Sequence, residues 1–354
     1  MSRDEDAKWM RRCIELARNA EGRTAPNPMV GAVVVRDGEM LSEGWHVKAG
    51  DAHAEPAALQ NSNKDTRGAT IYVNLEPCCH HGRTAPCTDA ILQAGIARVV
   101  VGMVDPNPIV AGKGIALLKA AGLTVDVGVE ERASRELNAG YLKAMYRGVP
   151  RVWLKTASTL DGRIADSVGE SKWITSEEAR GLVHRLRDRM DAVLVGSGTL
   201  LADNPALTTR TDGGRDALPV ILDSQLRCPE DAKVFQGSRR PVIYCAEEAP
   251  ERDLPADIVR VAHRADGLDL KAVLADLVTR GVHNLLVEGG GQVHRSFLEQ
   301  SLADRLLLFM APTVLAGGPG FVGGAPVGLA EAYRFRLIGS RKLGPDILLD
   351  FEVV

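Results

Sequence analysis

The chain has 354 residues, of which 45% are hydrophobic and 25% charged, values typical of a folded protein long enough for two domains. The net charge of -3 gives no indication of a nucleic-acid or membrane surface, and 4% aromatic residues are too few for base-stacking platforms. The N-terminal segment lacks the apolar core of a signal peptide, and no window approaches the length of a membrane span. We therefore expect a small molecule as partner, with neither nucleic acid nor membrane.

Six cysteines are present, and Cys13, Cys228 and Cys245 are scattered along the chain. In a long chain without an export signal they do not form a disulfide framework, so we expect these three to be small buried hydrophobes. Free thiols suit a reducing compartment, which predicts a cytoplasmic protein.

The first half of the chain begins with apolar residues at helical spacing over 4–20. Residues 29–46 are typical of a hairpin that turns at Asp37-Gly38. From Ile71 onward strands and helices alternate, which predicts a layered α/β domain with helices on both sheet faces. Further strands are expected at 69–77, 97–106 and 123–129, and helices at 53–60, 87–95, 113–122 and 132–146.

A boundary is expected where Gly148 and Pro150 precede a fresh strand, giving domains 1–147 and 148–354. The second half again alternates, with an amphipathic helix that begins after Ser176. Two late strands are expected to be antiparallel at one edge. The elements of this half are strands at 151–157, 191–198, 218–224, 240–246, 284–291, 304–315 and 346–354, and helices at 176–190 and 293–302.

The segment LEPCCHHGRTAPC holds three cysteines and two histidines, and DAHAEPAAL lies upstream of it. His53 opens a helix, Cys78 follows a strand and Cys87 opens the next helix, so the three side chains can converge at one sheet edge. Three nitrogen and sulfur ligands leave one open position on a tetrahedral zinc, which is typical of catalytic sites. Zinc lowers the pKa of bound water towards neutrality. Glu55, on the same turn as His53, is then placed to shuttle a proton.

This pattern is that of zinc nucleobase deaminases, except that eight residues rather than two separate Cys78 from Cys87. The longer loop carries Arg83, which could reach a substrate phosphate. A closed structural zinc site remains an alternative, with His53, Cys78, Cys87 and a fourth ligand from Cys79, His80 or His81. That alternative gives Glu55 no role.

Asn27 precedes the first strand, and its amide could read a pyrimidine edge. His46 lies close to the expected metal helix. For either residue alone, a surface or packing role is the simpler interpretation.

The segments TAPNPMVGAVVV, GWHVKAGDAHAE and LEPCCHHGRTAPCTDAI together resemble the deaminase half of the bifunctional riboflavin-biosynthesis deaminase/reductase family. The long cysteine spacing is the spacing of that family. The second half resembles the reductase of the same family through LKTASTLDGRIA, SKWITS, VILDS and LLVEGGG, so that the likeness covers nearly the whole chain.

The resemblance implies a cytidine-deaminase-like α/β/α domain fused to a dihydrofolate-reductase-like α/β domain. It implies zinc-dependent deamination of 2,5-diamino-6-(5-phosphoribosylamino)pyrimidin-4(3H)-one, followed by NADPH-dependent reduction of its ribosyl group to ribityl. It assigns the zinc to His53, Cys78 and Cys87, and the proton shuttle to Glu55. It places cofactor contacts at Ala157, Trp173, Thr199, Asp203, Ser224, Gly290, Gly291, Gln292, Val293, His294, Arg295 and Ser296, and substrate contacts at Ser171, Arg187, Leu207, Arg210 and Glu288.

When the second half is considered from its residues alone, it contains no Gly-x-Gly-x-x-Gly motif, so a classical dinucleotide-binding site is not supported. The turn Gly289–Gly291 could let a pyrophosphate approach a helix N-terminus, although a plain tight turn is an equal alternative. Arg187 is suited to gripping a phosphate, but its residue type alone favours a solvated helix face. Lys155 is a candidate proton donor.

Two other functions remain open from the residues. One is a nucleoside or tRNA deaminase with a redox-inactive partner domain, against which the low positive charge argues. The other is a non-catalytic, zinc-stabilised nucleotide-binding module. The apolar late strands suggest a homodimer or a higher homo-oligomer.

Overall fold

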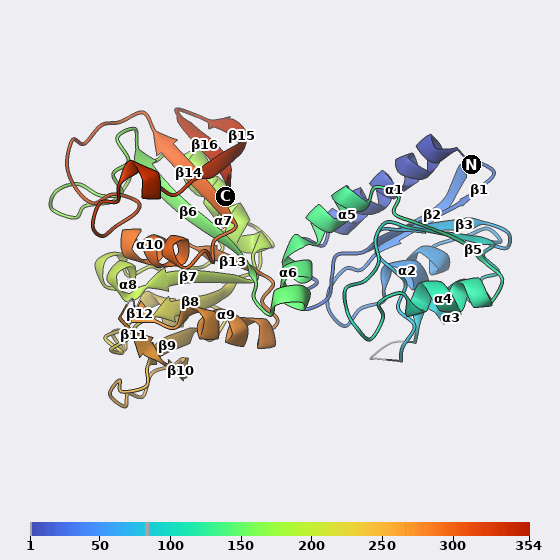
Figure 1. Ribbon diagram of the computed structural model, residues 1–354, viewed down its shortest axis with the longest axis horizontal. Helices are drawn as coiled ribbons and strands as arrows, with labels where there is room; N and C mark the ends of the chain where they lie inside the picture. Colours follow the sequence, from blue (N-terminus) through green and yellow to red (C-terminus); the bar gives the residue numbers. More distant parts are fainter. Residues whose placement is uncertain (1, 82–84, 266) are drawn as a thin grey trace. The chain divides into compact units, whose positions relative to one another are not determined.

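The computed structural model describes residues 2–81, 85–265 and 267–354, and the chain divides into two compact units, Met1–Gly148 and Val149–Val354 (Figure 1). The first unit is built around a five-stranded sheet and the second around a nine-stranded sheet. Within the described ranges, no helix is both long enough and apolar enough to cross a membrane.

The sheet of the first unit has the order β2-β1-β3-β4-β5. The expected hairpin is present: Asp37 and Gly38 take positive φ angles of 53° and 79°, as a tight turn between paired strands requires. β3 is antiparallel to β1, whereas β3, β4 and β5 are parallel. The elements are α1 (Arg3–Arg18), β1 (Gly31–Arg36), β2 (Glu39–Trp45), α2 (Ala54–Gln60), β3 (Thr70–Val73), α3 (Cys87–Gln93), β4 (Arg98–Val101), α4 (Lys113–Ala120), β5 (Thr124–Val127), α5 (Glu131–Leu137) and α6 (Ala139–Arg147).

Helices cover both faces of this sheet, as alternating strand side chains require (Figure 1). Val33 and Val35 of β1 pack against Cys13 of α1 on one face. Ala32 and Val34 pack on the other face, which α2, α3 and α4 cover. Cys13 is fully buried, and so are Cys228 and Cys245 of the second unit, as expected.

The nine-stranded sheet has the order β10-β9-β8-β7-β13-β6-β14-β16-β15. The seven strands from β10 to β14 in this spatial order are parallel to their neighbours. β16 is antiparallel to β14, and β15 is antiparallel to β16. The strands are β6 (Arg151–Thr159), β7 (Ala192–Gly196), β8 (Leu218–Leu222), β9 (Val242–Ala246), β10 (Asp257–Val261), β13 (Asn284–Val287), β14 (Arg305–Ala311), β15 (Phe335–Leu343) and β16 (Asp346–Val353), with a small ribbon of β11 (His263–Arg264) and β12 (Gly267–Leu268).

The two late strands expected at one edge, β14 and β16, are antiparallel to each other. The outermost strand, β15, was not expected from the sequence. Its charged residues Arg336, Arg341 and Lys342 interrupt the apolar pattern, and most of its side chains are exposed because it lies at the edge of the sheet.

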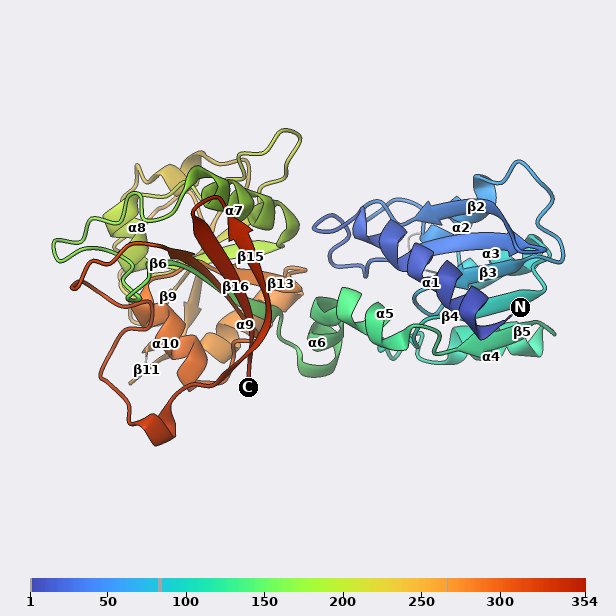
Figure 2. The ribbon, with the colours of Figure 1, turned by 90° about the horizontal axis from the view of Figure 1, so that it is seen from above.

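Helices also lie on both faces of the second sheet (Figure 2). The side chains of α9 and α10 join one core, and those of α7 and α8 pack on the opposite face. Because β6, β13, β7 and β8 are parallel, their carboxyl ends meet at one edge, where ligands bind in open α/β sheets. The helices are α7 (Glu177–Arg189), α8 (Ser197–Asp203), η1 (Lys233–Gln236), α9 (Leu270–Thr279), α10 (Gly291–Glu299) and η2 (Leu329–Glu331).

Candidate active sites

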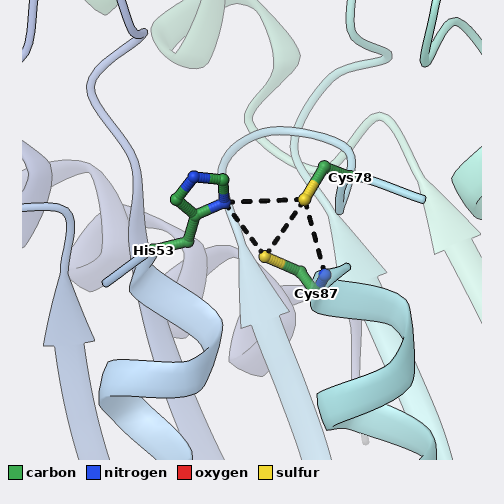
Figure 3. A group of neighbouring side chains, drawn as sticks. All are labelled: His53, Cys78 and Cys87. Carbon is green, nitrogen blue, oxygen red and sulfur yellow. Dashed lines mark hydrogen bonds between the residues drawn. The ribbon is translucent and has the colours of Figure 1, made fainter. Parts of the chain in front are cut away.

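The three predicted metal ligands come together in the first unit, where α2 and α3 begin (Figure 3). His53 Nδ1 lies 3.2 Å from Cys87 Sγ and 3.5 Å from Cys78 Sγ, and the two Sγ atoms are 3.4 Å apart. A tetrahedral zinc with Zn–S of about 2.3 Å and Zn–N of about 2.0 Å separates such ligands by roughly 3.5–3.8 Å. The donor set therefore fits a zinc ion after a small adjustment.

The two thiols of this cluster have pKa values that are shifted in opposite directions. The hydrogen bond between the two thiols lowers the pKa of Cys78, whereas the same contact and burial raise the pKa of Cys87. The Cys87 backbone N–H also donates to Cys78 Sγ at 3.4 Å. Cys78 is thus held as the thiolate, which is the form that binds metal, and a bound dication would deprotonate its neighbour too.

Among the described residues, the ligand group contains only His53, Cys78 and Cys87. Cys79, His80 and His81 do not join it, so a closed four-ligand site gains no support there. Arg83, the predicted phosphate contact of this loop, lies outside the described residues.

Glu55 lies in the first turn of α2, two residues after His53, and only 3% of it is exposed. Its Oε2 atom has no hydrogen-bond partner, which is unusual for a buried carboxyl group. Burial raises the pKa of Glu55 to about 7, and the negative charge of Cys78 adds to this effect. A carboxyl group in this state can take up and release a proton near neutral pH.

Asn27 and His46 form a pair in the first unit. Asn27 Nδ2 lies 3.0 Å from His46 Nε2, and His46 Nδ1 lies 3.0 Å from the carbonyl oxygen of Ala52. A carbonyl only accepts, so His46 Nδ1 carries the proton and Nε2 accepts from the Asn27 amide. Burial lowers the pKa of His46, which agrees with a neutral ring. The amide of Asn27 is thereby oriented, and its Oδ1 accepts no hydrogen bond from the residues that the structure describes.

Glu76 is a buried residue of this site to which the sequence reasoning gave no role. Its carboxylate accepts hydrogen bonds from the backbone N–H groups of Asp105, Gly112 and Ile115, at 3.2, 2.9 and 3.2 Å. These bonds fix the segment that leads to Cys78. Glu76 is part of the LEPC motif, but nothing local in the sequence reveals its distant partners.

In the second unit, a cavity of about 750 Å³ opens at the carboxyl edge of the sheet, between β6, β13, α7 and α8. Predicted cofactor and substrate residues line it together. They are Ala157, Trp173, Thr199, Asp203 and Gly290 of the cofactor set, and Ser171, Arg187, Leu207, Arg210 and Glu288 of the substrate set.

Arg187 and Glu288 form the buried ionic centre of this cavity. The Arg187 guanidinium donates to both carboxylate oxygens, at 2.7 and 3.0 Å, and Lys155 Nζ lies 3.7 Å from the same carboxylate. Burial alone would raise the pKa of Glu288, but the charges of Arg187 and Lys155 lower it to about 2. Burial lowers the pKa of Lys155. Arg187 is therefore not on a solvated helix face, as its residue type alone suggested, because only 13% of its side chain is exposed.

Other cavity residues are tied to one another. Ser171 Oγ donates to Asp203 Oδ1 at 3.1 Å, which links a predicted substrate contact to a predicted cofactor contact. Arg187 Nη1 donates to the carbonyl oxygen of Thr208 at 3.1 Å and so holds the loop that carries Leu207 and Arg210. Arg210 is exposed, which leaves its charge accessible to a ligand.

The glycine turn after β13 adjoins the cavity only at its start. Gly290 lines the cavity, whereas α10 begins at Gly291, where a Cβ atom would lie 2.7 Å from backbone atoms of Gly320 and Gly323. The residues from Gln292 to Ser296 lie within the helix and do not line the cavity. The His294 side chain is buried, with Nδ1 2.9 Å from the carbonyl oxygen of Phe321.

Seven predicted cofactor contacts thus lie outside the cavity walls, namely Ser224 and the six residues from Gly291 to Ser296. Arg295 bonds to Glu299 and to backbone oxygens of Gly323 and Ala325. Ser224 follows β8, two strands from the glycine turn in the sheet order.

Two family models match the chain. The RibD C-terminal domain matches residues 150–349, and the cytidine and deoxycytidylate deaminase zinc-binding region matches residues 3–103. Riboflavin biosynthesis protein RibD of Aquifex aeolicus is 40% identical over 360 residues, covering 99% of both chains. RibD of Escherichia coli is 37% identical over 362 residues, covering 98% of both.

Solved structures are similar over the same length. A diaminohydroxyphosphoribosylaminopyrimidine deaminase/5-amino-6-(5-phosphoribosylamino)uracil reductase of Thermotoga maritima has a TM-score of 0.91 at 37% identity, with 99% of both chains covered. RibD of Acinetobacter baumannii has a TM-score of 0.92 at 37% identity, with 100% of both covered.

Proposed function

Because this chain belongs to the RibD family, and so joins a zinc-dependent deaminase to an NADPH-dependent reductase in riboflavin biosynthesis, we propose which of its residues perform each reaction. The first reaction removes the 2-amino group of 2,5-diamino-6-(5-phosphoribosylamino)pyrimidin-4(3H)-one with water and releases ammonia. The second reduces the ribosyl group and gives 5-amino-6-(5-phosphoribitylamino)uracil.

In the deaminase, His53, Cys78 and Cys87 hold the zinc, which supplies Lewis-acid activation of water when bound. Glu55 takes a proton from the attacking water and delivers one to the departing amino group. The single observation that carries this role is its buried, unpartnered Oε2. The pKa of Glu55, raised to about 7 by burial, agrees with this role. Asn27, oriented by His46, accepts a hydrogen bond from the pyrimidine through Oδ1.

In the reductase, NADPH supplies the hydride, and the residues of the chain align the two reactants. Glu288 is held ionised by Arg187 and Lys155, so it can accept hydrogen bonds from sugar hydroxyls. Arg210 is exposed at the cavity wall and is suited to the ribose phosphate. Ser171 and Leu207 complete the substrate contacts.

The cofactor lies along the carboxyl edge of the sheet in this proposal. Ala157, Trp173, Thr199 and Asp203 contact it from the cavity, and Ser224 and the segment Gly290–Ser296 contact it from the neighbouring turns. The start of α10 supports this arrangement, because its first N–H groups have no intrahelical partner and can bind a pyrophosphate.

We further propose a homo-oligomer and a cytoplasmic location. The outermost strand β15 supports the first, because Leu337 and Ile338 expose 56% and 50% of their surface at the sheet edge. The free thiols of Cys78 and Cys87 support the second, because metal ligation needs them reduced.

The test is NADPH oxidation on the diaminopyrimidinone ribotide by the wild type and by Glu55→Ala. We expect the wild type to consume NADPH, and the variant to do so only with the deaminated compound, while it keeps its zinc. If the variant deaminates as fast as the wild type, the role of Glu55 is wrong. If ammonia is released but no nicotinamide cofactor is oxidised on either compound, the reductase assignment fails.

A further inference from the structure

The turn after β8 carries an arginine to which neither reaction above assigns a role. Arg227 Nη2 donates to Ser197 Oγ at 2.8 Å, and its Nε lies 3.8 Å from Asp223 Oδ1. Even so, 52% of the Arg227 side chain is exposed. The guanidinium is therefore anchored on one side and accessible to a ligand on the other.

The backbone on both sides of Arg227 is fixed. Leu226 has a φ of 51°, a left-handed conformation, and its N–H donates to the carbonyl of Asp223 at 3.0 Å. Cys228 N–H donates to the Asp223 carboxylate at 2.8 Å. Arg252 Nη1 donates to the carbonyl oxygens of Leu226 and Cys228, both at 2.7 Å. The turn thus presents one exposed guanidinium from a rigid frame, which is the arrangement that lowers the entropic cost of binding an ion.

This turn continues the edge formed by the glycine turn. A Cβ atom on Gly290 would lie 3.4 Å from Thr199 Oγ1, so the start of α8 lies against the glycine turn. Ser197, two residues earlier, contacts Arg227. The three features follow β13, β7 and β8, which are neighbours in the sheet.

The direction of a bound dinucleotide follows from the cavity. Its reactive end must meet the substrate beside Glu288, which directly follows β13, and Lys155, which lies within β6. With the pyrophosphate at the glycine turn, the adenosine half extends the other way, past β7 towards β8. Ligands cross the carboxyl ends of parallel strands in this manner.

We propose that Arg227 binds the 2′-phosphate of NADPH, with Ser224 on the same turn as a second donor, and that this contact sets the preference for NADPH over NADH. This inference rests on the proposed reductase function. An arginine fork matches phosphate oxygens geometrically, and the buried Asp223 carboxylate balances its charge when no phosphate is bound. A purely structural role, holding the turn to α8 through Ser197, is the competing explanation.

Calorimetric titration distinguishes the 2′-phosphate contact from the purely structural role, because adenosine 2′,5′-bisphosphate and AMP differ only in the 2′-phosphate. Both ligands are titrated into the full-length wild type, Arg227→Gln and Arg227→Lys. Arg240→Gln is the matched control, since Arg240 is also exposed but precedes β9 at the opposite end of the strands. NADPH and NADH are titrated in parallel by protein fluorescence.

In Arg227→Gln, we expect affinity for the bisphosphate and for NADPH to fall about 10- to 100-fold, while affinity for AMP and NADH stays within about twofold. The affinity of Arg227→Lys for the bisphosphate and for NADPH should lie between those of the wild type and Arg227→Gln, because lysine keeps the charge without the planar fork. Unchanged discrimination in Arg227→Gln, or an equal loss for all four ligands, overturns the inference and leaves the reductase intact. Failure of the wild type to bind any of them overturns the reductase function itself.

Discussion

Arg187 and Glu288 lie 101 residues apart in the chain, yet their side chains are joined by two hydrogen bonds of 2.7 and 3.0 Å. Arg187 comes from α7 and Glu288 from the end of β13, so the contact connects a covering helix to the centre of the sheet. It places opposite charges inside a cavity whose other walls hold apolar side chains such as Phe309. The pair therefore links the stability of the second unit to its activity.

Replacing Arg187 with glutamine should lower both the stability of the second unit and its reductase activity. Among the described residues, Lys155 would be the remaining ion-pair partner of Glu288, and breaking a buried pair costs about 3–5 kcal/mol of unfolding free energy. The kcat/KM for reduction should fall by about 10- to 100-fold or more, whereas zinc-dependent deamination should be unchanged. Urea unfolding and separate assays of the two reactions measure this. Arg185→Gln, on an exposed position of the same helix, is the control and should behave as the wild type.

Acid should destabilise the second unit through Glu288. Its folded pKa of about 2 lies below the value of about 4.3 for an unfolded glutamate, so its contribution is fully present above the unfolded pKa. That contribution, about 3 kcal/mol, is lost as the pH falls from near 5 towards 2. Urea unfolding from pH 7 to pH 3 should therefore be less pH-dependent in Glu288→Gln. Parallel profiles for the variant and the wild type would contradict the depressed pKa.

Removing one metal ligand should separate the two reactions. Cys78→Ser exchanges a thiolate for a weak hydroxyl ligand, so the zinc content of the purified protein should fall well below that of the wild type. Deamination should fall with it, while reduction of the already deaminated substrate continues. Elemental analysis and the two assays report this. Cys79→Ser is the matched control, because Cys79 lies outside the ligand group and its replacement should leave zinc bound.

The Asn27–His46 pair should act as one unit. Asn27→Ala removes the amide, and His46→Ala removes the acceptor that orients it. Each change should raise the KM for deamination about 3- to 10-fold, with a smaller effect on kcat. The double variant should be little worse than either single variant, because contacting residues are not additive. Fully multiplicative effects would show that His46 does not act through Asn27.

Some features depend on short stretches of sequence and could be predicted from it. The hairpin at Asp37-Gly38 follows from turn residues between two apolar runs. His53, Glu55, Cys78 and Cys87 stand out because metal chemistry needs those residue types at the starts and ends of neighbouring elements. The structure brings the three ligand atoms within 4.8 Å of one another.

Other features exist only through contacts between distant segments. From the sequence alone, Arg187 was predicted to lie on a solvated helix face, and no role was predicted for Glu76 or Arg227. The edge strand β15 was not predicted, because a mostly exposed strand does not need the alternation of apolar and polar residues by which strands are predicted.

The sequence by itself determined which chemical groups this protein has and in which elements the zinc ligands and Glu55 lie, since propensity, turn chemistry and ligand type are local properties. It did not predict α8, which carries Thr199 and Asp203 of the second cavity. Only the tertiary structure decided which of those groups are buried, which are paired and which remain free to bind. The physical reason is that burial and charge pairing depend on what the rest of the chain packs against a residue. Arg187 and Arg227 illustrate this: both are arginines, but one is enclosed with Glu288 and the other is held open at the sheet edge.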